Sequence, residues 1–395
     1  MNGTSRAGLG ARLRGGAHLS RIAVTAFVAV GLSLSLAACG SSSSSSSSSS
    51  AEVDETGLTE AKANLDAYRE PPKWQGPDAP VDVSGLEGKK VVYISVSNAI
   101  PVLKYWSDAV KSLVESEAGV DLSVVDAKGS VDEANKGFQQ AIASKADAVV
   151  IVAFSTELFK KQIEDAKAAG IKVITAQSGV PGKVDGGQDA EVTFDYEKVG
   201  ELIGDWFIVD SEGKGKGMVV TSDDVPASQP QAQATLSEVK EKCPACDLKV
   251  EDVQIPQWEA SIPTLFQSTV NSDPDRKYYL PLYDGQGLSG LGALRTAGAT
   301  DVKVGAFNAT PGIVEQLKDD KSNLKLDIGG HNEWWVYAAA DTIFRVLSDT
   351  DPVENYNVGL RIFDTSNADL IEGDDELAWY EFDGYRTEFG NLWKK

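Results

Sequence analysis

Two cysteines, Cys243 and Cys246, have the type and spacing that most directly suggest chemistry, because they form a Cys-Pro-Ala-Cys motif. Such a pair fits a redox centre, part of a zinc site or a local disulfide. Structural zinc takes four ligands, and beyond residue 38 the sequence adds one histidine, His331, and one cysteine, Cys39. We expect a disulfide if the chain is exported, with free thiols and a redox or metal function as alternatives.

A glycine-rich motif at residues 285–290, Gly-Gln-Gly-Leu-Ser-Gly, matches the G-x-G-x-x-G fingerprint of dinucleotide sites. We interpret it as an ordinary strand–turn–helix connection. The first residues of the chain predict export from the cell, as described next, and nucleotide cofactors are scarce outside the cell. The sequence has no Walker A, H-E-x-x-H or G-x-S-x-G motif, and a single histidine beyond residue 38 leaves little for His-based acid–base catalysis. We therefore expect no catalytic residues, no cofactor and no metal.

The first 38 residues have the features of an export signal. An arginine-bearing front end precedes an apolar run at residues 22–36, which is shorter than the roughly 20 residues that a membrane span needs. Leu-Ala-Ala-Cys-Gly at residues 36–40 resembles the lipobox of bacterial lipoproteins, in which the cysteine is lipidated; a plain secretory signal with a chance cysteine is the alternative. The serine tract at 41–50 suits a flexible tether. The sequence thus predicts a protein outside the cytoplasmic membrane, anchored by a lipid on Cys39.

The chain that follows the signal is strongly acidic. Residues 1–38 hold four arginines and no acid, so their removal takes the formal net charge from −22 to −26. Nucleic-acid phosphates would be repelled, which argues against a nucleic-acid partner. The length fits two domains of ordinary size.

Apolar runs and helical patterns alternate from residue 90 onward, which predicts an α/β fold with parallel strands buried on both faces. Strands are expected near residues 91–96, 148–154, 172–176, 217–221, 277–283 and 302–307, and helices near 102–118, 131–144, 156–169, 229–242, 260–271, 288–297 and 311–320. Two such series, divided near Asp195, predict two similar, Rossmann-like lobes; the multi-strand hinge that joins them is implied by the family resemblance given next. Because ligands bind at the carboxyl ends of parallel strands, we expect a ligand cleft between the lobes.

The sequences from VVYISVSNAIP to GIKVIT (91–175) and from YYLPLYDGQG to RVLSD (278–349) resemble type I periplasmic sugar-binding proteins of the ribose-binding kind. The resemblance covers about residues 89–351 and implies a solute-binding protein that delivers a small ligand to an ABC permease. We divide the chain into a signal peptide (1–38), a lipid anchor, serine linker and N-terminal extension (39–88), lobe 1 (89–195 plus 331–358) and lobe 2 (196–330 plus 359–395). Within the extension, a short helix at 59–68 is expected, with Trp74 as its anchor on the body.

The resemblance also implies which residues of this chain contact the ligand, each assigned from one position of the family pattern. They are polar or aromatic residues at the ends of strands or at the lobe crossing: Asn98, Gln177, Gln229, Trp258, Asp284, Asn308 and His331, with Trp106 as a further candidate. Where the family often has charged pairs, this chain has amides at most positions, and amides both donate and accept hydrogen bonds. A neutral sugar or polyol is therefore the expected ligand, with a cationic or amine-bearing ligand that pairs with Asp284 as the alternative.

Each of these residues also has a structural interpretation. Asp284 could cap the following helix, His331 could be a turn residue, Asn308 could be a loop cap, and the tryptophans could pack in the core. We nevertheless expect Asp284 and Trp258 to line the cleft and His331 to lie at a crossing between the lobes. As a strand-end carboxylate that supports no core, Asp284 should be replaceable by alanine without harm to the fold.

The expected function is capture of a neutral solute by a monomeric, lipid-anchored binding protein for an ABC importer. Two other functions remain open. A sensory binding protein could present the ligand to a receptor kinase, and an exported glycosidase would need two carboxylates about 5–10 Å apart, for which Asp223, Asp224 and Asp284 are the only candidates we identify.

Replacement of Cys39 by serine should release the protein from the membrane, because a single lipid-modified cysteine is the only anchor that the sequence suggests. Fractionation of cells that express the Cys39→Ser protein tests this. A variant that remains in the membrane fraction after signal processing contradicts the lipobox interpretation.

Overall fold

The structure, a computed structural model, describes residues 53–184, 186–373 and 376–395. The predicted signal peptide, Cys39 and the serine tract lie outside the described residues. Within the described ranges, no helix has both the length and the apolar character needed to cross a membrane.

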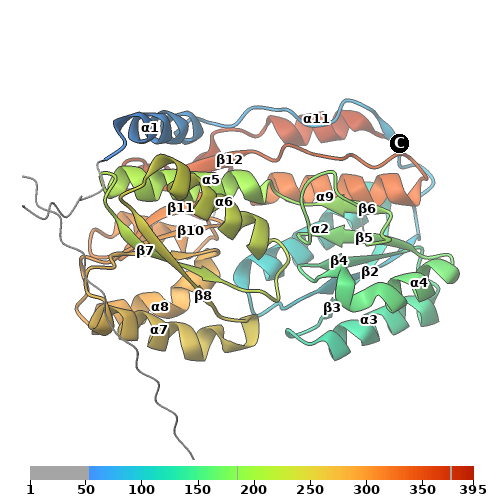
Figure 1. Cartoon of the computed structure of the whole chain (residues 1–395). Helices are drawn as coiled ribbons and strands as arrows, with labels where there is room; N and C mark the ends of the chain where they lie inside the picture. Colours follow the sequence, from blue (N-terminus) through green and yellow to red (C-terminus); the bar gives the residue numbers. More distant parts are fainter. Residues whose placement is uncertain (1–52, 185, 374–375) are drawn as a thin grey trace, which may run out of the picture. The chain divides into compact units, whose positions relative to one another are not determined.

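Lobe 1 is built on a five-stranded parallel sheet in the order β3-β2-β4-β5-β6. Its strands are β2 (Lys90–Ser95), β3 (Asp121–Asp126), β4 (Ala148–Val152), β5 (Lys172–Ala176) and β6 (Ala190–Val192). The helices around it are α2 (Pro101–Ala118), α3 (Val131–Ser144), the 3₁₀ turn η1 (Thr156–Phe159) followed by α4 (Lys160–Ala168), and α9 (Asn332–Leu347), which returns from the other lobe to contact α2, β5 and β6 (Figure 1).

Lobe 2 contains a six-stranded sheet in the order β12-β11-β10-β9-β7-β8, in which only the β11–β12 pair is antiparallel. The strands are β7 (Lys216–Thr221), β8 (Asp247–Asp252), β9 (Tyr278–Pro281), β10 (Lys303–Phe307), β11 (Leu324–Gly330) and β12 (Leu360–Asp364). Its helices are α5 (Tyr196–Asp210), α6 (Ser228–Lys242), α7 (Trp258–Ser272) and α8 (Asp284–Thr296), with the 3₁₀ turns η2 (Ile255–Gln257), η3 (Val314–Lys318) and η4 (Ala368–Leu370). The predicted two-lobed α/β fold is confirmed.

Local sequence explains where these elements begin and end. All five residues of β4 are buried, as expected for a central strand covered on both faces. Helix α2 begins with Pro101 at its first position and ends at Gly119, which has the left-handed conformation that glycine adopts readily. Helix α3 is capped by Ser130, whose side chain accepts a hydrogen bond from the Glu133 amide.

The differences from the sequence prediction have physical causes. The edge strands β3 and β8 were not anticipated, because at the margin of a sheet their residues are only partly buried and lack a continuous apolar run. The helix expected at 311–320 is reduced to the turn η3, since Pro311 and Gly312, the latter with φ 86°, interrupt the start of the segment.

The glycines of the G-x-G-x-x-G motif allow close packing: a Cβ on Gly290 would lie 2.2 Å from the ring of Phe266 on α7.

The chain passes between the lobes at three places within the described residues: from β6 to α5, from β11 to α9 and from α9 to β12. The middle passage is the shortest, because β11 ends at Gly330, His331 caps α9, and α9 begins at Asn332. These connections form the hinge that we expected between the lobes.

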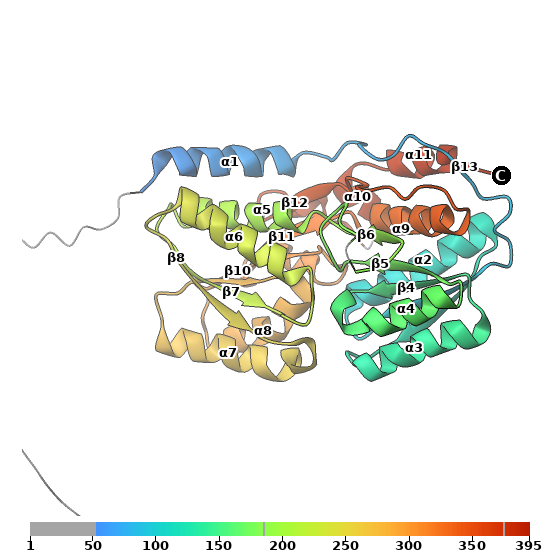
Figure 2. The same cartoon turned by 45° about the vertical axis from the view of Figure 1, so that its right-hand side comes forward.

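The N-terminal extension contacts both lobes. Helix α1 (Glu55–Arg69) packs on α5 and β12 of lobe 2, where Asn64 donates to Asp205 at 2.9 Å and Arg69 pairs with Asp364 at 2.7 Å. The chain then runs along the same outer side, as Figures 1 and 2 show, to β1 (Val81–Asp82). Trp74 stacks on Trp334 of α9 with ring centroids 5.4 Å apart, so its expected role as an anchor is confirmed.

The C-terminal segment continues this layer. After β12, helix α10 (Glu376–Tyr380) and helix α11 (Gly384–Leu392) lead to β13 (Trp393–Lys394), which pairs in parallel with β1. Trp393 donates to Asp341 of α9 at 2.8 Å. The sequence division had grouped all of 359–395 with lobe 2, whereas α11 and β13 make their contacts with α9 and β1 beside lobe 1.

Cys243 and Cys246 form a disulfide in the turn between α6 and β8, as the sequence analysis expected.

Trp74→Ala should lower the free energy of unfolding by about 2 kcal/mol, because it removes a half-buried indole from contact with Trp334 and Phe389. Urea denaturation followed by circular dichroism measures the effect. Lys73→Ala, at the exposed neighbouring position, is the control and should change the value by less than about 0.5 kcal/mol. Equal stability of the two variants would show that the Trp74 contact does not stabilise the protein.

Candidate ligand-binding site

A small cavity lies between the two lobes, at the carboxyl ends of both sheets. Its volume is about 40 Å³, which is space for about three water molecules. A wider space of about 540 Å³ adjoins it and shares Ile100, Ile255 and Trp258 with its lining, so the two form an inner chamber and an outer mouth. This is where open α/β sheets bind ligands.

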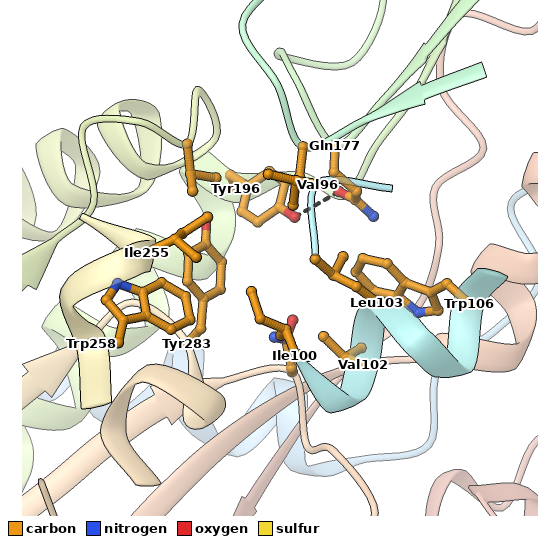
Figure 3. A pocket seen from close by; sticks show the side chains of 13 residues that line it. Val96, Ile100, Val102, Leu103, Trp106, Gln177, Tyr196, Ile255, Trp258 and Tyr283 are labelled. Carbon is orange, nitrogen blue, oxygen red and sulfur yellow. Dashed lines mark hydrogen bonds between the residues drawn. The ribbon is translucent and has the colours of Figure 1, made fainter. Parts of the chain in front are cut away.

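Lobe 1 contributes residues that follow β2, β4 and β5, together with the first turns of α2. These are Val96, Ile100, Val102, Leu103, Trp106, Ala153 and Gln177. Lobe 2 and the crossing into it contribute residues that follow β7, β8, β9 and β10 and the start of α5. These are Tyr196, Val225, Ile255, Trp258, Tyr283 and Asn308 (Figure 3).

Gln177 is the most constrained polar residue of the cavity. Its backbone is left-handed, with φ 56°, and its side chain is 2% exposed. Its Oε1 accepts hydrogen bonds from the Tyr196 hydroxyl at 2.6 Å and the Thr193 hydroxyl at 3.2 Å. These bonds fix the amide so that Nε2 is the free end, and Nε2 has no hydrogen-bond partner among the described residues. Gln177 can therefore donate to a ligand.

Two further polar atoms of the lining lack a partner within the described parts of the chain: the Tyr283 hydroxyl and Asn308 Oδ1. Both side chains are buried, with 8% and 4% exposure. Buried polar groups without partners are uncommon in folded proteins because each one costs free energy. Three of them belong to residues that line one cavity, which makes this cavity the candidate ligand site.

The tryptophans of the lining present ring surface, because their N–H groups are already used. Trp106 Nε1 donates to Asn332 Oδ1 at 2.9 Å, and Trp258 Nε1 donates to the Ser222 hydroxyl at 2.8 Å. Asn332 in turn donates to the carbonyl of Asn308 at 3.1 Å. This chain of hydrogen bonds joins lobe 1, the start of α9 and lobe 2 beside the cavity.

Comparison with known proteins gives the family. The sequence profile described as "Periplasmic binding protein domain" matches residues 91–351. The chain belongs to this periplasmic binding protein family. The family is extracytoplasmic, which agrees with the predicted export signal.

Individual members of the family are more distant. The galactofuranose-binding protein YtfQ of Escherichia coli is 22% identical over 234 residues, which cover 56% of this chain and 73% of that protein. A solved ABC transporter solute-binding protein of Agrobacterium vitis with bound allitol has a TM-score of 0.66 at 18% identity, covering 72% of this chain and 98% of that one. A 5-methylthioribose transporter solute-binding protein of Thermotoga lettingae, in complex with 5-methylthioribose, has a TM-score of 0.65 at 17% identity and covers 76% of this chain and 98% of that one. At these identities the solved structures establish the fold.

Of the eight candidate residues from the sequence, the structure brings four to the wall of this periplasmic binding protein's cavity: Trp106, Gln177, Trp258 and Asn308. Asn98 does not line it; its backbone N–H donates to Asp126 at 3.0 Å. Gln229 is exposed, donates to Asp223, and lines a separate surface groove beside Ser178.

Asp284 lies behind the cavity, where it supports the loop that carries Asn308. Its carboxylate accepts from the Thr310 N–H at 2.6 Å and the Thr310 hydroxyl at 3.0 Å, and its side chain is 2% exposed. Burial raises the pKa of Asp284 to about 6. Asp327, which accepts from the Ala309 N–H, has a pKa raised well above its usual range by burial and then by the charge of Asp284. The expectation that Asp284 supports no core is wrong, because the strand end turns its side chain into the protein.

His331 caps α9 and is fully buried. Its Nδ1 accepts from the Trp334 N–H at 3.4 Å, its Nε2 meets the Phe382 carbonyl at 3.2 Å, and its ring stacks on Tyr380. Burial lowers its pKa to about 3, so the neutral imidazole, with its proton on Nε2 and a lone pair on Nδ1 for the Trp334 N–H, is the native form. It lies at the crossing from β11 to α9, as expected, but outside the lining of the cavity.

Several residues of the wall carry no polar signal by which the sequence reveals them. Ile100, Val102, Leu103 and Ile255 resemble core residues in sequence, and Tyr196 opens a helix whose buried face is mostly apolar. For Tyr283 a signal existed, since it directly precedes Asp284 at the end of β9, but the carboxylate was preferred.

Asp284→Ala should destabilise the protein by about 2 kcal/mol, because it leaves the buried N–H and hydroxyl of Thr310 without an acceptor. The thermal unfolding midpoint of the purified protein measures this. Asp223→Ala is the matched control, since Asp223 is exposed and should tolerate the change. If Asp284→Ala unfolds at the parent temperature, the carboxylate does not hold the loop.

Proposed function

We propose that this protein is the lipid-anchored, extracytoplasmic binding component of an ABC importer and that it captures a small neutral sugar or polyol. The observation that carries the proposal is the cavity at the facing ends of two parallel sheets, where Gln177 Nε2, the Tyr283 hydroxyl and Asn308 Oδ1 lack partners among the described residues. Hydroxyl groups both donate and accept, so they match this mixture of donors and acceptors.

The lining favours a neutral ligand. None of the described residues that form the inner cavity carries a charged side chain. Two carboxylates behind the lobe 2 wall are already hydrogen-bonded within the protein: Asp284 accepts from Thr310, and Asp224 accepts from the Ile255 N–H. A ligand ammonium or carboxylate would be buried here without a counter-ion, which is strongly unfavourable.

Similar proteins support the ligand class. The relatives bind galactofuranose, allitol or 5-methylthioribose by their descriptions, and all three are neutral polyhydroxyl molecules. Transport follows from the family's mechanism: a hinge motion opens the lobes, the ligand enters, and a permease recognises the closed form. The anchor rests on the sequence at residues 36–40, with the serine tract as the tether.

The experiment that tests the function is a thermal-shift screen of the purified protein against neutral sugars and polyols, with amino acids and carboxylates as comparison sets. A ligand at about 100 times its Kd adds about 2.7 kcal/mol of stability, which is readily detected. Stabilisation by amino acids or carboxylates, and by no neutral polyol, would overturn the proposal.

Tyr283→Phe should weaken binding of a ligand found in this screen by about 5- to 30-fold, because it removes one hydrogen-bonding group from the cavity. The fold should be as stable as before, since the hydroxyl has no partner among the described residues. Isothermal titration calorimetry measures the affinity.

Tyr93→Phe provides a close control. Tyr93 lies in β2, is buried, and also has a hydroxyl without a partner in the described chain, but it does not line the cavity. Its affinity should equal that of the parent. If the two variants bind alike, the Tyr283 hydroxyl does not contact the ligand.

A further inference from the structure

The cavity wall has far more hydrocarbon than hydrogen-bonding groups. Its thirteen residues comprise seven aliphatic side chains, four aromatic ones and two amides. The indole N–H groups of Trp106 and Trp258 are used within the protein, and the Tyr196 hydroxyl donates to Gln177. Few hydrogen-bonding groups of the thirteen lining residues are therefore left for a ligand.

Three buried side-chain atoms of the lining have no partner in the described chain: Gln177 Nε2, the Tyr283 hydroxyl and Asn308 Oδ1. A hexopyranose carries five hydroxyl groups and a ring oxygen. Three protein groups can satisfy only some of them at the inner cavity, and the others must reach the wider mouth, whose lining adds Ser97, Lys128, Glu259 and Ser289. Each hydroxyl that is buried without a partner lowers affinity by about tenfold to a hundredfold, so a fully hydroxylated sugar fits this wall poorly.

The aliphatic residues line the cavity from both lobes, with one group of three on the lobe 1 side. Ile100, Val102 and Leu103 come from the junction of β2 and α2 on the lobe 1 side, while Ile255 faces the cavity from lobe 2 beside Trp258 (Figure 3). Gln177 lies apart from Ile100 and Val102 in the same view. One part of the cavity thus offers hydrocarbon contact, and hydrocarbon buried there gains the full benefit of leaving water.

We propose that the ligand is an amphiphilic neutral polyol: a deoxygenated or alkyl-substituted sugar or polyol. Its few hydroxyl or carbonyl groups meet Gln177, Tyr283 and Asn308, and its CH₃ or CH₂ portion packs on Ile100, Val102 and Leu103. The inference rests on the proposed function and narrows its ligand class.

Matched ligand pairs test the inference. Each pair differs by one hydroxyl replaced by hydrogen: D-galactose with 6-deoxy-D-galactose, D-ribose with 5-deoxy-D-ribose, and butane-1,2,4-triol with butane-1,2-diol. Calorimetry on the full protein should show at least one pair that binds, with the deoxygenated member about tenfold tighter. If the hydroxylated members bind as tightly or more tightly, the inference fails and the proposed function stands. If no member of any pair binds, the inference fails, and the thermal-shift screen decides the proposed function separately.

A variant locates the contact. Val102→Thr keeps the shape of the side chain but places a hydroxyl in the aliphatic wall. It should reduce the preference for the deoxygenated member about fivefold or more. Val110→Thr, on the same helix and fully buried away from the cavity, is the control and should leave the ratio of the two affinities unchanged even if it lowers stability. An unchanged ratio in Val102→Thr would overturn the assignment of this wall to the ligand.

Discussion

The cavity depends on the hydrogen-bond chain from Trp106 through Asn332 to the carbonyl of Asn308. Trp106 belongs to the first helix of lobe 1, Asn332 begins the helix that returns from lobe 2, and Asn308 follows the lobe 2 strand β10. All three are buried, so the bonds are shielded from water and costly to break. They hold two separate sheets in the arrangement in which their carboxyl ends share one space.

Around this link, each lobe prepares its own part of the site. In lobe 1, Tyr196 and Thr193 orient the Gln177 amide from the segment that leads into lobe 2. In lobe 2, Asp284 and Asp327 hold the backbone of the loop that follows Asn308. The two buried carboxylates thus position the uncharged Asn308. The described residues of the cavity wall carry no charge, although the protein as a whole is acidic.

The outer layer formed by the N- and C-terminal segments adds a second connection between the lobes. The family match begins at residue 91 and ends at 351, so both segments lie outside it. Helix α1 is fixed to lobe 2 through Asn64 and Arg69, while Trp74 and the β1–β13 pair are fixed beside α9. A hinge motion that separates the lobes must carry this layer with it, and its contacts therefore contribute to the energy difference between open and closed forms.

The sequence by itself determined the fold class and the places where a site can form. Continuous apolar runs such as Ala148–Val152 indicate buried parallel strands. Polar or aromatic residues that follow such strands lie near the carboxyl ends of the two sheets, which face each other; Gln177, Trp258 and Asn308 are examples. Tertiary structure decided which of these side chains face the cavity. Asp284 and His331 occupy similar strand-end positions, but one turns to the backbone of Thr310 and the other caps α9. Side-chain direction depends on neighbours distant in sequence, and so does the aliphatic wall, because Ile100 and Ile255 cannot be told from core residues until the lobes are packed together.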